Sequence, residues 1–166
     1  MPREIRLTRG MVAIVDDDDY QELARFKWQA VNVSGRKWYA CRSIWRDGKS
    51  SRIYMHRQIT GAGAGDEVDH VDGDGLNNRT CNLRLATRSQ NCANRATRKP
   101  GLKFKGVYPA KRDGFWRAYI AHEGKQISLG WHDSQEKAAR AYDQAALRFY
   151  GAYARLNFPH EDFAHE

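Results

Sequence analysis

The 166-residue sequence lacks any apolar run long enough to serve as a signal peptide or to cross a membrane. It also has only three cysteines, Cys41, Cys81 and Cys92, and none of them belongs to a Cys-x-x-Cys pair. This spacing supports neither a disulfide framework nor a structural zinc site built from paired cysteines. We therefore expect a cytoplasmic protein without structural zinc that is stabilised by its own packing and has no membrane partner.

Acidic residues are scarce in one part of the chain, so the formal charge is unevenly placed. The whole sequence carries a net charge of +8 at pH 7. Residues 95–130 contain nine Lys or Arg and two acidic residues, which gives 9 − 2 = +7 for this stretch. A charge run alone usually indicates a solvated face, but a concentrated basic stretch interleaved with aromatic residues is typical of nucleic-acid binding. We expect double-stranded DNA as the partner.

One carboxylate, one imidazole and two amides lie close together in the sequence. Asp69 and His70 are adjacent, and Asn82 and Asn91 follow them. Carboxylate and amide oxygens suit magnesium or manganese better than zinc. The unperturbed pKa of histidine, about 6.5, lets it take a proton from water near neutral pH. An isolated histidine would be interpreted as an exposed loop residue, but these neighbours favour a metal-dependent phosphodiester hydrolase with His70 in a catalytic role.

The residues around this motif predict a compact arrangement of two strands and a helix. A Gly- and Asn-rich turn over residues 71–78 precedes the alternating run Leu83-Arg84-Leu85-Ala86, which indicates strand, loop and strand. A short helix would then hold Asn91 and turn it toward the strand that carries Asp69. The loop lacks the later ligands of a calcium-binding EF-hand, so its aspartates, Asp72 and Asp74, are interpreted as turn residues.

At these residues the segment resembles the HNH nuclease family, and in particular its intron-encoded homing endonuclease branch. The resemblance covers about residues 56–95 and is carried by the order Asp-His, Asn-Asn-x-x-x-Asn-Leu and Ser-x-Asn. It implies that His70 is the general base and that Asp69 and Asn91 bind one divalent cation, Mg²⁺ or Mn²⁺. It also implies that Asn82 ties the loop together and orients His70. Many family members brace this core with zinc-bound cysteine pairs, which are missing here.

The chain before this motif predicts a β-rich segment. The dipeptide Asp47-Gly48 is a strong hairpin signal. Four runs are expected to form strands of one sheet, namely residues 12–15, 27–31, 37–45 and 51–55. Four consecutive aspartates, residues 16–19, cannot all face one ion, so we interpret them as a solvated turn or a helix start. His56 is expected to pack or to contact phosphate rather than to catalyse.

Three strands and a helix are predicted after residue 103. Turns at residues 111–114 and at Gly124 separate three strand-like runs, which indicates a small antiparallel sheet. Asp133, with Glu136 three residues later, resembles a capping box, and Gly151 ends the helical periodicity that follows. The alanines of that helix allow it to lie close against the sheet.

This pattern closely resembles the plant ethylene-response-factor (APETALA) DNA-binding domain over about residues 103–158. The resemblance is carried by Gly106-Val107, Leu129-Gly130, residues 138–146 and Leu156-Asn157-Phe158. It implies that the sheet enters the major groove. By position, the residues that would face DNA are Lys105, Tyr108, Lys111, Arg112, Arg117, Lys125 and Gln126.

Some base-reading residues of the plant domains are replaced in this chain. Ser128 stands where that family often has tryptophan, so the plant recognition sequence is not assumed. Trp116 and Trp131 are expected to pack in the core or between sheet and helix rather than to stack on bases.

Together these patterns predict an α+β protein and a DNA endonuclease of the homing type. The expected parts are a β-rich N-terminal segment (1–54), an HNH core with a ββα-metal fold (55–95), a basic linker (96–102), an APETALA-type domain (103–158) and a tail (159–166). We expect a monomer or weak dimer without an obligate protein partner, in a bacterial or phage-infected cell. The alternative is a DNA-binding transcriptional regulator with an inactive nuclease core, against which the complete set of Asp69, His70 and Asn91 argues. Whether one chain nicks or two chains cut both strands stays open.

Overall fold

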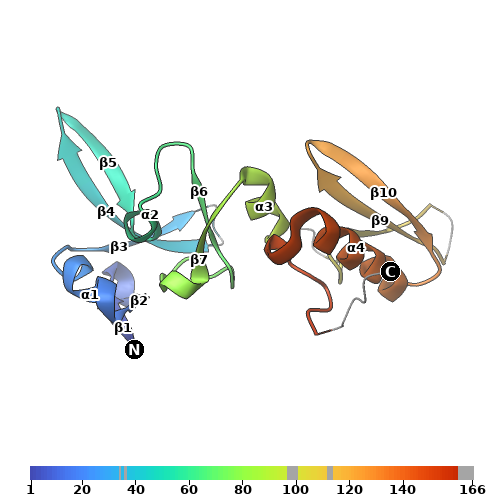
Figure 1. The fold of residues 1–166 in the computed structure, drawn as a ribbon, viewed down its shortest axis with the longest axis horizontal. Helices are drawn as coiled ribbons and strands as arrows, with labels where there is room; N and C mark the ends of the chain where they lie inside the picture. The colour runs from blue at the N-terminus through green and yellow to red at the C-terminus, as the bar shows by residue number, and fades with distance from the viewer. Residues whose placement is uncertain (34, 36, 97–100, 112–113, 161–166) are drawn as a thin grey trace. The chain divides into compact units, whose positions relative to one another are not determined.

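The computed structural model describes residues 1–33, 35, 37–96, 101–111 and 114–160. The chain divides into two compact units, Met1–Thr87 and Arg88–Glu166. Both contain helices and strands, which confirms the predicted α+β class (Figure 1). No helix in the described part of the chain combines the length and apolar character that crossing a bilayer requires.

The division between the units falls inside the predicted nuclease core of residues 55–95, because the helix that holds Asn91 belongs to the second unit. The predicted domain limits stay a prediction. Most of the predicted basic linker and of the tail, residues 97–100 and 161–166, lies outside the described residues.

The described part of the first unit contains three small antiparallel sheets. They are the pair β1 (Pro2–Arg6) and β2 (Val12–Asp16), the sheet β3 (Gln29–Val33), β4 (Lys37–Arg46) and β5 (Lys49–Tyr54), and the pair β6 (Glu67–His70) and β7 (Leu83–Ala86). Its helices are α1 (Asp17–Leu23) after β2 and α2 (Met55–Thr60) after β5, with short 3₁₀ turns at Thr8–Gly10 and Thr80–Asn82. The predicted strand, loop and strand around Asp69 are therefore present.

The N-terminal strands differ from the prediction in one respect. The run at residues 12–15 pairs with β1 in a separate sheet instead of joining β3, β4 and β5. Ile5 is the only buried residue of β1, so the sequence of this strand shows no alternation of apolar and polar residues that would predict it. The hairpin at Asp47-Gly48 is confirmed, since both residues have the positive φ, 50° and 70°, that a type I′ turn requires.

An apolar core connects the first two sheets with α1 and α2. It consists of Ile5, Leu7, Ala13, Val15, Leu23, Trp28, Ala30, Ala40 and Met55. Trp28 satisfies its indole N–H by donating to the Leu23 carbonyl at 2.8 Å. Leu76, from the loop after β6, packs against this core, so the core also supports the segment that follows Asp69 and His70.

The second unit is a three-stranded antiparallel sheet packed on one long helix, as predicted. The strands β8 (Val107–Pro109), β9 (Trp116–His122) and β10 (Lys125–His132) are ordered β10-β9-β8, and α4 (Gln135–Tyr150) packs against them (Figure 1). α3 (Arg88–Ala93) and the turn Gly151–Tyr153 contact α4 or each other. The helix start is shifted by one residue from the prediction, because Ser134 is the N-cap and its hydroxyl accepts from the Lys137 amide at 3.2 Å. Gly151 ends the helix.

A buried carboxylate ties the C-terminal segment of this unit to α4. Asp143 is fully buried and accepts hydrogen bonds from the backbone amides of Asn157, at 2.9 Å, and Phe158, at 2.8 Å. The Asn157 side chain accepts from the Lys105 amide at 2.7 Å and donates to the Lys105 carbonyl at 3.2 Å. Asp143 and Asn157 therefore connect α4 to the segment before β8 and to the segment that follows the helix.

Two glycines with the same backbone conformation allow the closeness of α4 to be tested. Gly106 and Gly124 both have φ of 75°. A Cβ on Gly106 would lie 2.0 Å from the Tyr142 ring and 2.7 Å from the Tyr119 carbonyl, whereas one on Gly124 meets nothing within 4 Å in the described residues. We predict that Gly106→Ala lowers the free energy of unfolding by about 1–3 kcal/mol more than Gly124→Ala, because overpacking adds to the shared backbone cost. Urea unfolding measures the difference, and equal losses would contradict the close approach.

Candidate functional site

Asp69 and His70 end β6, and both side chains are buried. Pairing with β7 places Asp69 directly opposite Arg84. The Asp69 Oδ2 accepts two hydrogen bonds from the Arg84 guanidinium, 2.9 Å from Nε and 2.7 Å from Nη2. The motif spacing does not reveal Arg84, although a cation opposite a carboxylate on a paired strand is a recognisable stabilising pair. Because the pair is largely buried, each charge depends on the other.

His70 packs in a cluster of rings with Tyr39, Tyr54 and His56. The His56 ring lies 5.1 Å from that of His70, edge to face, and stacks on Tyr54 at 5.4 Å. Tyr39 lies 5.7 Å from His70 and 5.5 Å from His56, measured between ring centroids. The cluster joins β4, β5, α2 and β6, so the imidazole of His70 is positioned by three segments distant in sequence. His56 is 9% exposed and has a packing role here.

Burial lowers the pKa of both histidines. For His70 a nearby lysine acts in the same direction, whereas the Asn78 side chain and two neighbouring carboxylates oppose it, and the pKa stays below 6.5. For His56 burial, followed by the charges of His70 and Arg57, lowers the pKa to about 3. Both rings are therefore neutral at pH 7, the state in which a histidine accepts a proton.

The loop after His70 is closed by the side chains of Asn82 and Asp72. The Asn82 Oδ1 accepts from the Asp72 amide at 3.0 Å, and its Nδ2 donates to the Asp72 carboxylate at 3.0 Å and to the Asn77 carbonyl at 2.8 Å. Burial raises the pKa of Asp72, but hydrogen bonds from the Asp74 amide, Asn77 and Asn82 outweigh it, so the pKa lies below its usual value. Asn82 thus fixes the backbone that follows His70, and its influence on catalysis stays a prediction.

The same loop is anchored to the first sheet. The Ile14 amide of β2 donates to the Leu76 carbonyl at 2.9 Å, and the Ile14 carbonyl accepts from the Asn78 amide at 2.7 Å. Asp16 accepts from the Thr80 amide at 2.7 Å, and this bond contributes most to lowering the pKa of Asp16. The first of the four aspartates therefore holds the site loop, while the other three begin α1.

Gly75 brings the loop against β4. A Cβ at this position would lie 2.3 Å from the Trp38 carbonyl oxygen and 2.6 Å from the Tyr39 ring. Only glycine fits there unless the loop or the strand moves. The loop after His70 therefore lies directly against Tyr39, whose ring also contacts His70.

Asp69 carries carboxylate oxygens of the kind that bind divalent cations, and one of them, Oδ2, is held by Arg84. Asn91, the other predicted ligand, is half-buried on α3 of the second unit, and its part in metal binding stays a prediction. The described residues contain no group of three or more His, Cys, Asp or Glu side chains that could hold a metal ion. Cys41 is buried, and Cys81 and Cys92 are exposed.

The face of the second sheet that is turned away from α4 carries polar and aromatic side chains. Ala118 and Ile120 of β9 are buried in the cores packed on α4, so the alternate residues Arg117 and Tyr119 point outward. The Arg117 guanidinium carbon lies 5.2 Å from the centroid of Tyr119 and 4.9 Å from that of Trp131. Among the described residues, the Arg117 Nε has no hydrogen-bond partner.

Trp131 lies on this outer face, and the expectation that it packs between sheet and helix was wrong. Its side chain is 53% exposed, because the register between β9 and β10 shifts between Ser128 and Trp131. Such a bulge reverses the face of every residue that follows. Trp116 packs against the core, as expected.

The predicted DNA-contacting residues do not all share the outer face. Tyr108 pairs with Arg117, and Gln126 pairs with Ala121, so these side chains belong to the outer face. Lys125 pairs with His122, on the side that packs against α4.

Three further predicted contacts lie outside the sheet. Lys111 is exposed after β8, and Arg112 lies outside the described residues. The Lys105 ammonium donates to the Ala93 carbonyl at the end of α3, and burial lowers the pKa of Lys105 to about 8. This lysine therefore joins α3 to the start of the sheet, and a DNA contact for it stays a prediction.

Comparison with known proteins confirms both resemblances. Residues 61–93 match a family described as HNH endonuclease. Protein 3.8 of Escherichia phage T7 is 35% identical over 90 residues, which are 54% of this chain and 74% of that protein. APETALA2-like protein 2 of Oryza sativa subsp. japonica is 41% identical over 69 residues, 42% of this chain and 16% of that protein. The AP2-like ethylene-responsive transcription factor TOE2 of Arabidopsis thaliana is also 41% identical over 69 residues, 42% of this chain and 14% of its own length. The chain thus spans only a small part of the plant relatives.

The burial of His56 predicts sensitivity to acid. With a pKa of about 3 when folded and about 6.5 when unfolded, this residue binds more protons in the unfolded state between those values, so stability falls as the pH drops below 6.5. At about 1.4 kcal/mol per pH unit, the loss from pH 6.5 to pH 5 approaches about 2 kcal/mol. We predict that His56→Phe, which keeps a ring, reduces this decline in urea unfolding at the two pH values.

The exposed His160 provides the control, because His160→Phe should leave the decline unchanged. Equal declines for wild type and His56→Phe would contradict the neutral state assigned to His56.

Proposed function

Because this chain belongs to the HNH endonuclease family, we propose that it is a metal-dependent endonuclease that hydrolyses phosphodiester bonds of double-stranded DNA at preferred sites. The observation that carries the proposal is the buried, neutral imidazole of His70 beside the Asp69–Arg84 pair, within the segment that matches the family. The motif resemblance favours a homing-type enzyme. The phage origin of one relative supports a setting in phage or bacterial mobile DNA and action in the cytoplasm of a bacterial or infected cell.

His70 acts as the general base in this proposal. Its lowered pKa keeps the ring unprotonated at neutral pH, so it can take a proton from the attacking water. Tyr39 and His56 hold the ring, and Asn82 fixes the backbone that follows it. The chain thus contributes an oriented base before any substrate arrives.

Asp69 and Asn91 would hold one Mg²⁺ or Mn²⁺ ion. When bound, such an ion stabilises charge on the phosphate oxygens and assists ionisation of water. Arg84 fixes the Asp69 carboxylate in position through two hydrogen bonds to one oxygen. Asn91 enters this proposal through its place in the sequence motif alone.

The outer face of the second sheet is the proposed recognition surface. Arg117, held between two aromatic rings, and Gln126 are placed to read base edges in the major groove. Lys111, Arg112 and Lys125 would contact phosphates around the sheet. Lys105 is assigned to the contact with α3 instead, because its ammonium is already bound there.

A DNA-binding transcriptional regulator with an inactive nuclease core is the second candidate. It is favoured by the ion pair itself, because Arg84 occupies the carboxylate that the metal would need. The plant relative TOE2 is named as a transcription factor, a function that needs DNA binding but no nuclease activity. This candidate predicts DNA binding without cleavage.

Cleavage of supercoiled plasmid separates the two candidates. We predict that the wild-type protein with Mg²⁺ gives nicked or linear product, that EDTA abolishes it, and that His70→Ala is slower by on the order of a hundredfold or more, because a general base typically contributes 10²–10⁴. His160→Ala, at an exposed histidine, should cut at the wild-type rate. Wild-type rates for the purified His70→Ala variant would refute the proposed base.

The metal role of Asp69 can be tested without measuring cleavage. Arg84→Met removes a cation and two hydrogen bonds from the buried carboxylate, which should cost about 3–5 kcal/mol of stability. If Asp69 binds Mg²⁺, the ion replaces the lost positive charge, and Mg²⁺ at ten times its dissociation constant should restore about 1.4 kcal/mol. Thermal unfolding with and without Mg²⁺ measures this recovery.

The double variant Asp69→Asn/Arg84→Met is the matched control, because it lacks the carboxylate and should gain nothing from Mg²⁺. Identical responses of the two variants would remove Asp69 from the metal site.

A further inference from the structure

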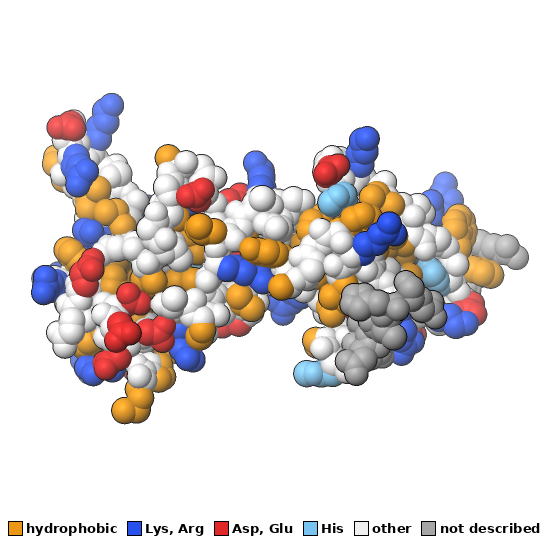
Figure 2. All heavy atoms as spheres, viewed as in Figure 1, with side chains coloured by type: hydrophobic (Ala, Val, Ile, Leu, Met, Phe, Trp, Pro, Cys, Tyr) orange, Lys and Arg blue, Asp and Glu red, His pale blue; other side chains and the backbone are white. Residues whose placement is uncertain are grey.

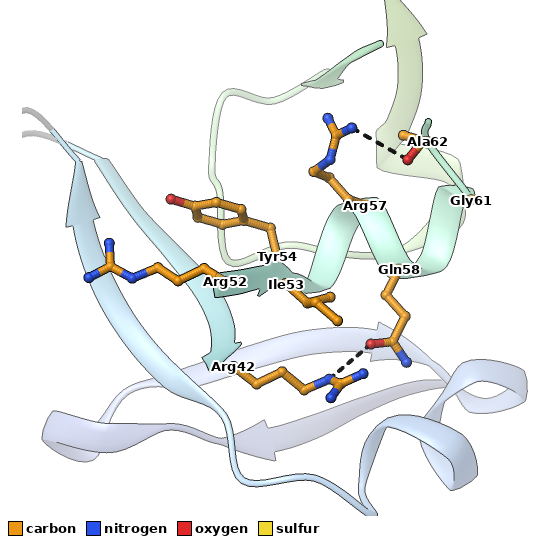
Figure 3. Close-up of a pocket in the computed structure, with 8 residues that line it drawn as sticks. All are labelled: Arg42, Arg52, Ile53, Tyr54, Arg57, Gln58, Gly61 and Ala62. Atoms are coloured by element: carbon orange, nitrogen blue, oxygen red, sulfur yellow. Dashed lines mark hydrogen bonds between the residues drawn. The ribbon is translucent and has the colours of Figure 1, made fainter. Parts of the chain in front are cut away.

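β4, β5 and α2 line a pocket of about 390 Å³ that contains three arginines and, among the described residues, no carboxylate (Figure 3). Arg42 donates to Gln58 at 3.2 Å, and Arg57 donates to backbone carbonyls of the segment after α2. Both guanidinium groups therefore serve the fold. Figure 3 shows that Arg52 extends from β5 away from α2 and from the other two arginines. The three cations therefore do not converge in this pocket. Arg52 belongs instead to the exposed part of the β4–β5 hairpin.

The β4–β5 hairpin presents a tryptophan and an arginine on one face. Ser43 pairs with Arg52, and Trp45 pairs with Ser50. Because paired residues share a face and residues two apart lie on the same side, Trp45, Arg52 and Tyr54 belong to one surface. Trp45 is 73% exposed, since the serine opposite it is too small to cover the indole. A large aromatic side chain is left open to a partner.

The outer part of this hairpin is basic, and its charges are not neutralised within the fold. Residues 43–52 contain three Lys or Arg and one acidic residue, which gives 3 − 1 = +2. In the described part of the chain, the side chains of Arg46, Lys49 and Arg52 take part in no hydrogen bond or ion pair. Figure 2 shows basic side chains beside an acidic one at the hairpin tip, while several acidic side chains gather over α1. The surface is complementary to a polyanion.

This surface is continuous with the candidate nuclease site. Tyr54 stacks on His56, and His56 contacts His70. The four residue steps from Ser50 to Tyr54 span about 13 Å, which corresponds to about four base pairs of duplex. DNA with its scissile phosphate at His70 would therefore pass over the hairpin.

We propose that the outer half of the β4–β5 hairpin, residues 43–52, is a second DNA-contacting surface that grips the duplex beside the cleaved bond. Arg52 contacts a phosphate on the face of Trp45, and Trp45 packs into the adjacent groove as an apolar wedge. Arg46 and Lys49 pair with each other on the opposite face beside the turn and reach phosphates from the hairpin tip. A second copy of the chain fits this surface less well, because it would oppose +2 to +2. This inference rests on the proposed function, since it places the DNA relative to His70.

The test uses the full chain and a DNA duplex, with binding measured in EDTA over a range of salt concentrations. Each phosphate contact contributes about 0.9 to the slope of log K against log salt, so the triple variant Arg46→Ala/Lys49→Ala/Arg52→Ala should flatten the slope by up to about 2.7. Trp45→Ala should weaken binding by about tenfold or more with the slope unchanged, as the loss of a buried aromatic anchor does.

Arg3→Ala is the matched control, because its guanidinium is on the same unit but is already held by Asp17 at 3.1 Å. It should leave the slope as in wild type. Unfolding midpoints of the hairpin variants should equal that of wild type, since the replaced side chains are exposed.

Unchanged affinity and slope in the hairpin variants, with a wild type that binds and cuts, would overturn the proposal. Self-association that Trp45→Ala abolishes, with DNA binding unaffected, would assign the face to a second copy and overturn it as well. A wild type that binds DNA through the hairpin but never cuts would refute the nuclease activity and leave the surface standing. The two failures are therefore distinguishable.

Discussion

The closed loop between β6 and β7 is the constraint on which the candidate nuclease site depends. The two strands form only four residue pairs, and a two-stranded ladder of that length is not stable alone in water. Hydrogen bonds from Asn82 close the loop, and β2, Asp16 and the tight approach at Gly75 attach it to the rest of the unit. These contacts hold the core without paired cysteines, which the sequence lacks.

Burial gives the site its chemistry as well as its position. The same packing that orients His70 lowers the pKa of its imidazole, so the ring is fixed and unprotonated together. Asp69 can be buried because Arg84 faces it across the ladder. The site therefore combines a neutral imidazole with a buried carboxylate whose charge is compensated by Arg84 on the neighbouring strand.

Much of the fold follows from local signals in the sequence. Asp47-Gly48 encodes its own turn, and the alternation of residues 83–86 encodes a strand, so both are recognisable without tertiary information. β1, the Arg84 partner of Asp69 and the outward position of Trp131 are not recognisable in this way. β1 forms by pairing with β2, and Arg84 faces Asp69 because of the register between β6 and β7. Trp131 points outward because the register between β9 and β10 shifts by one residue at a bulge. Features set by local sequence preference could therefore be predicted, whereas features set by pairing between distant strands could not.

The bond between Asp16 and Thr80 has a consequence for engineering this protein. Residues 61–93 carry the recognisable motif, but the carboxylate that holds the loop comes from a strand 64 residues earlier in the chain. The motif is thus not a portable cassette. A graft that transfers it to another scaffold must bring along β2, or rebuild an acceptor for the Thr80 amide, before the transplanted histidine can be expected to find its orientation.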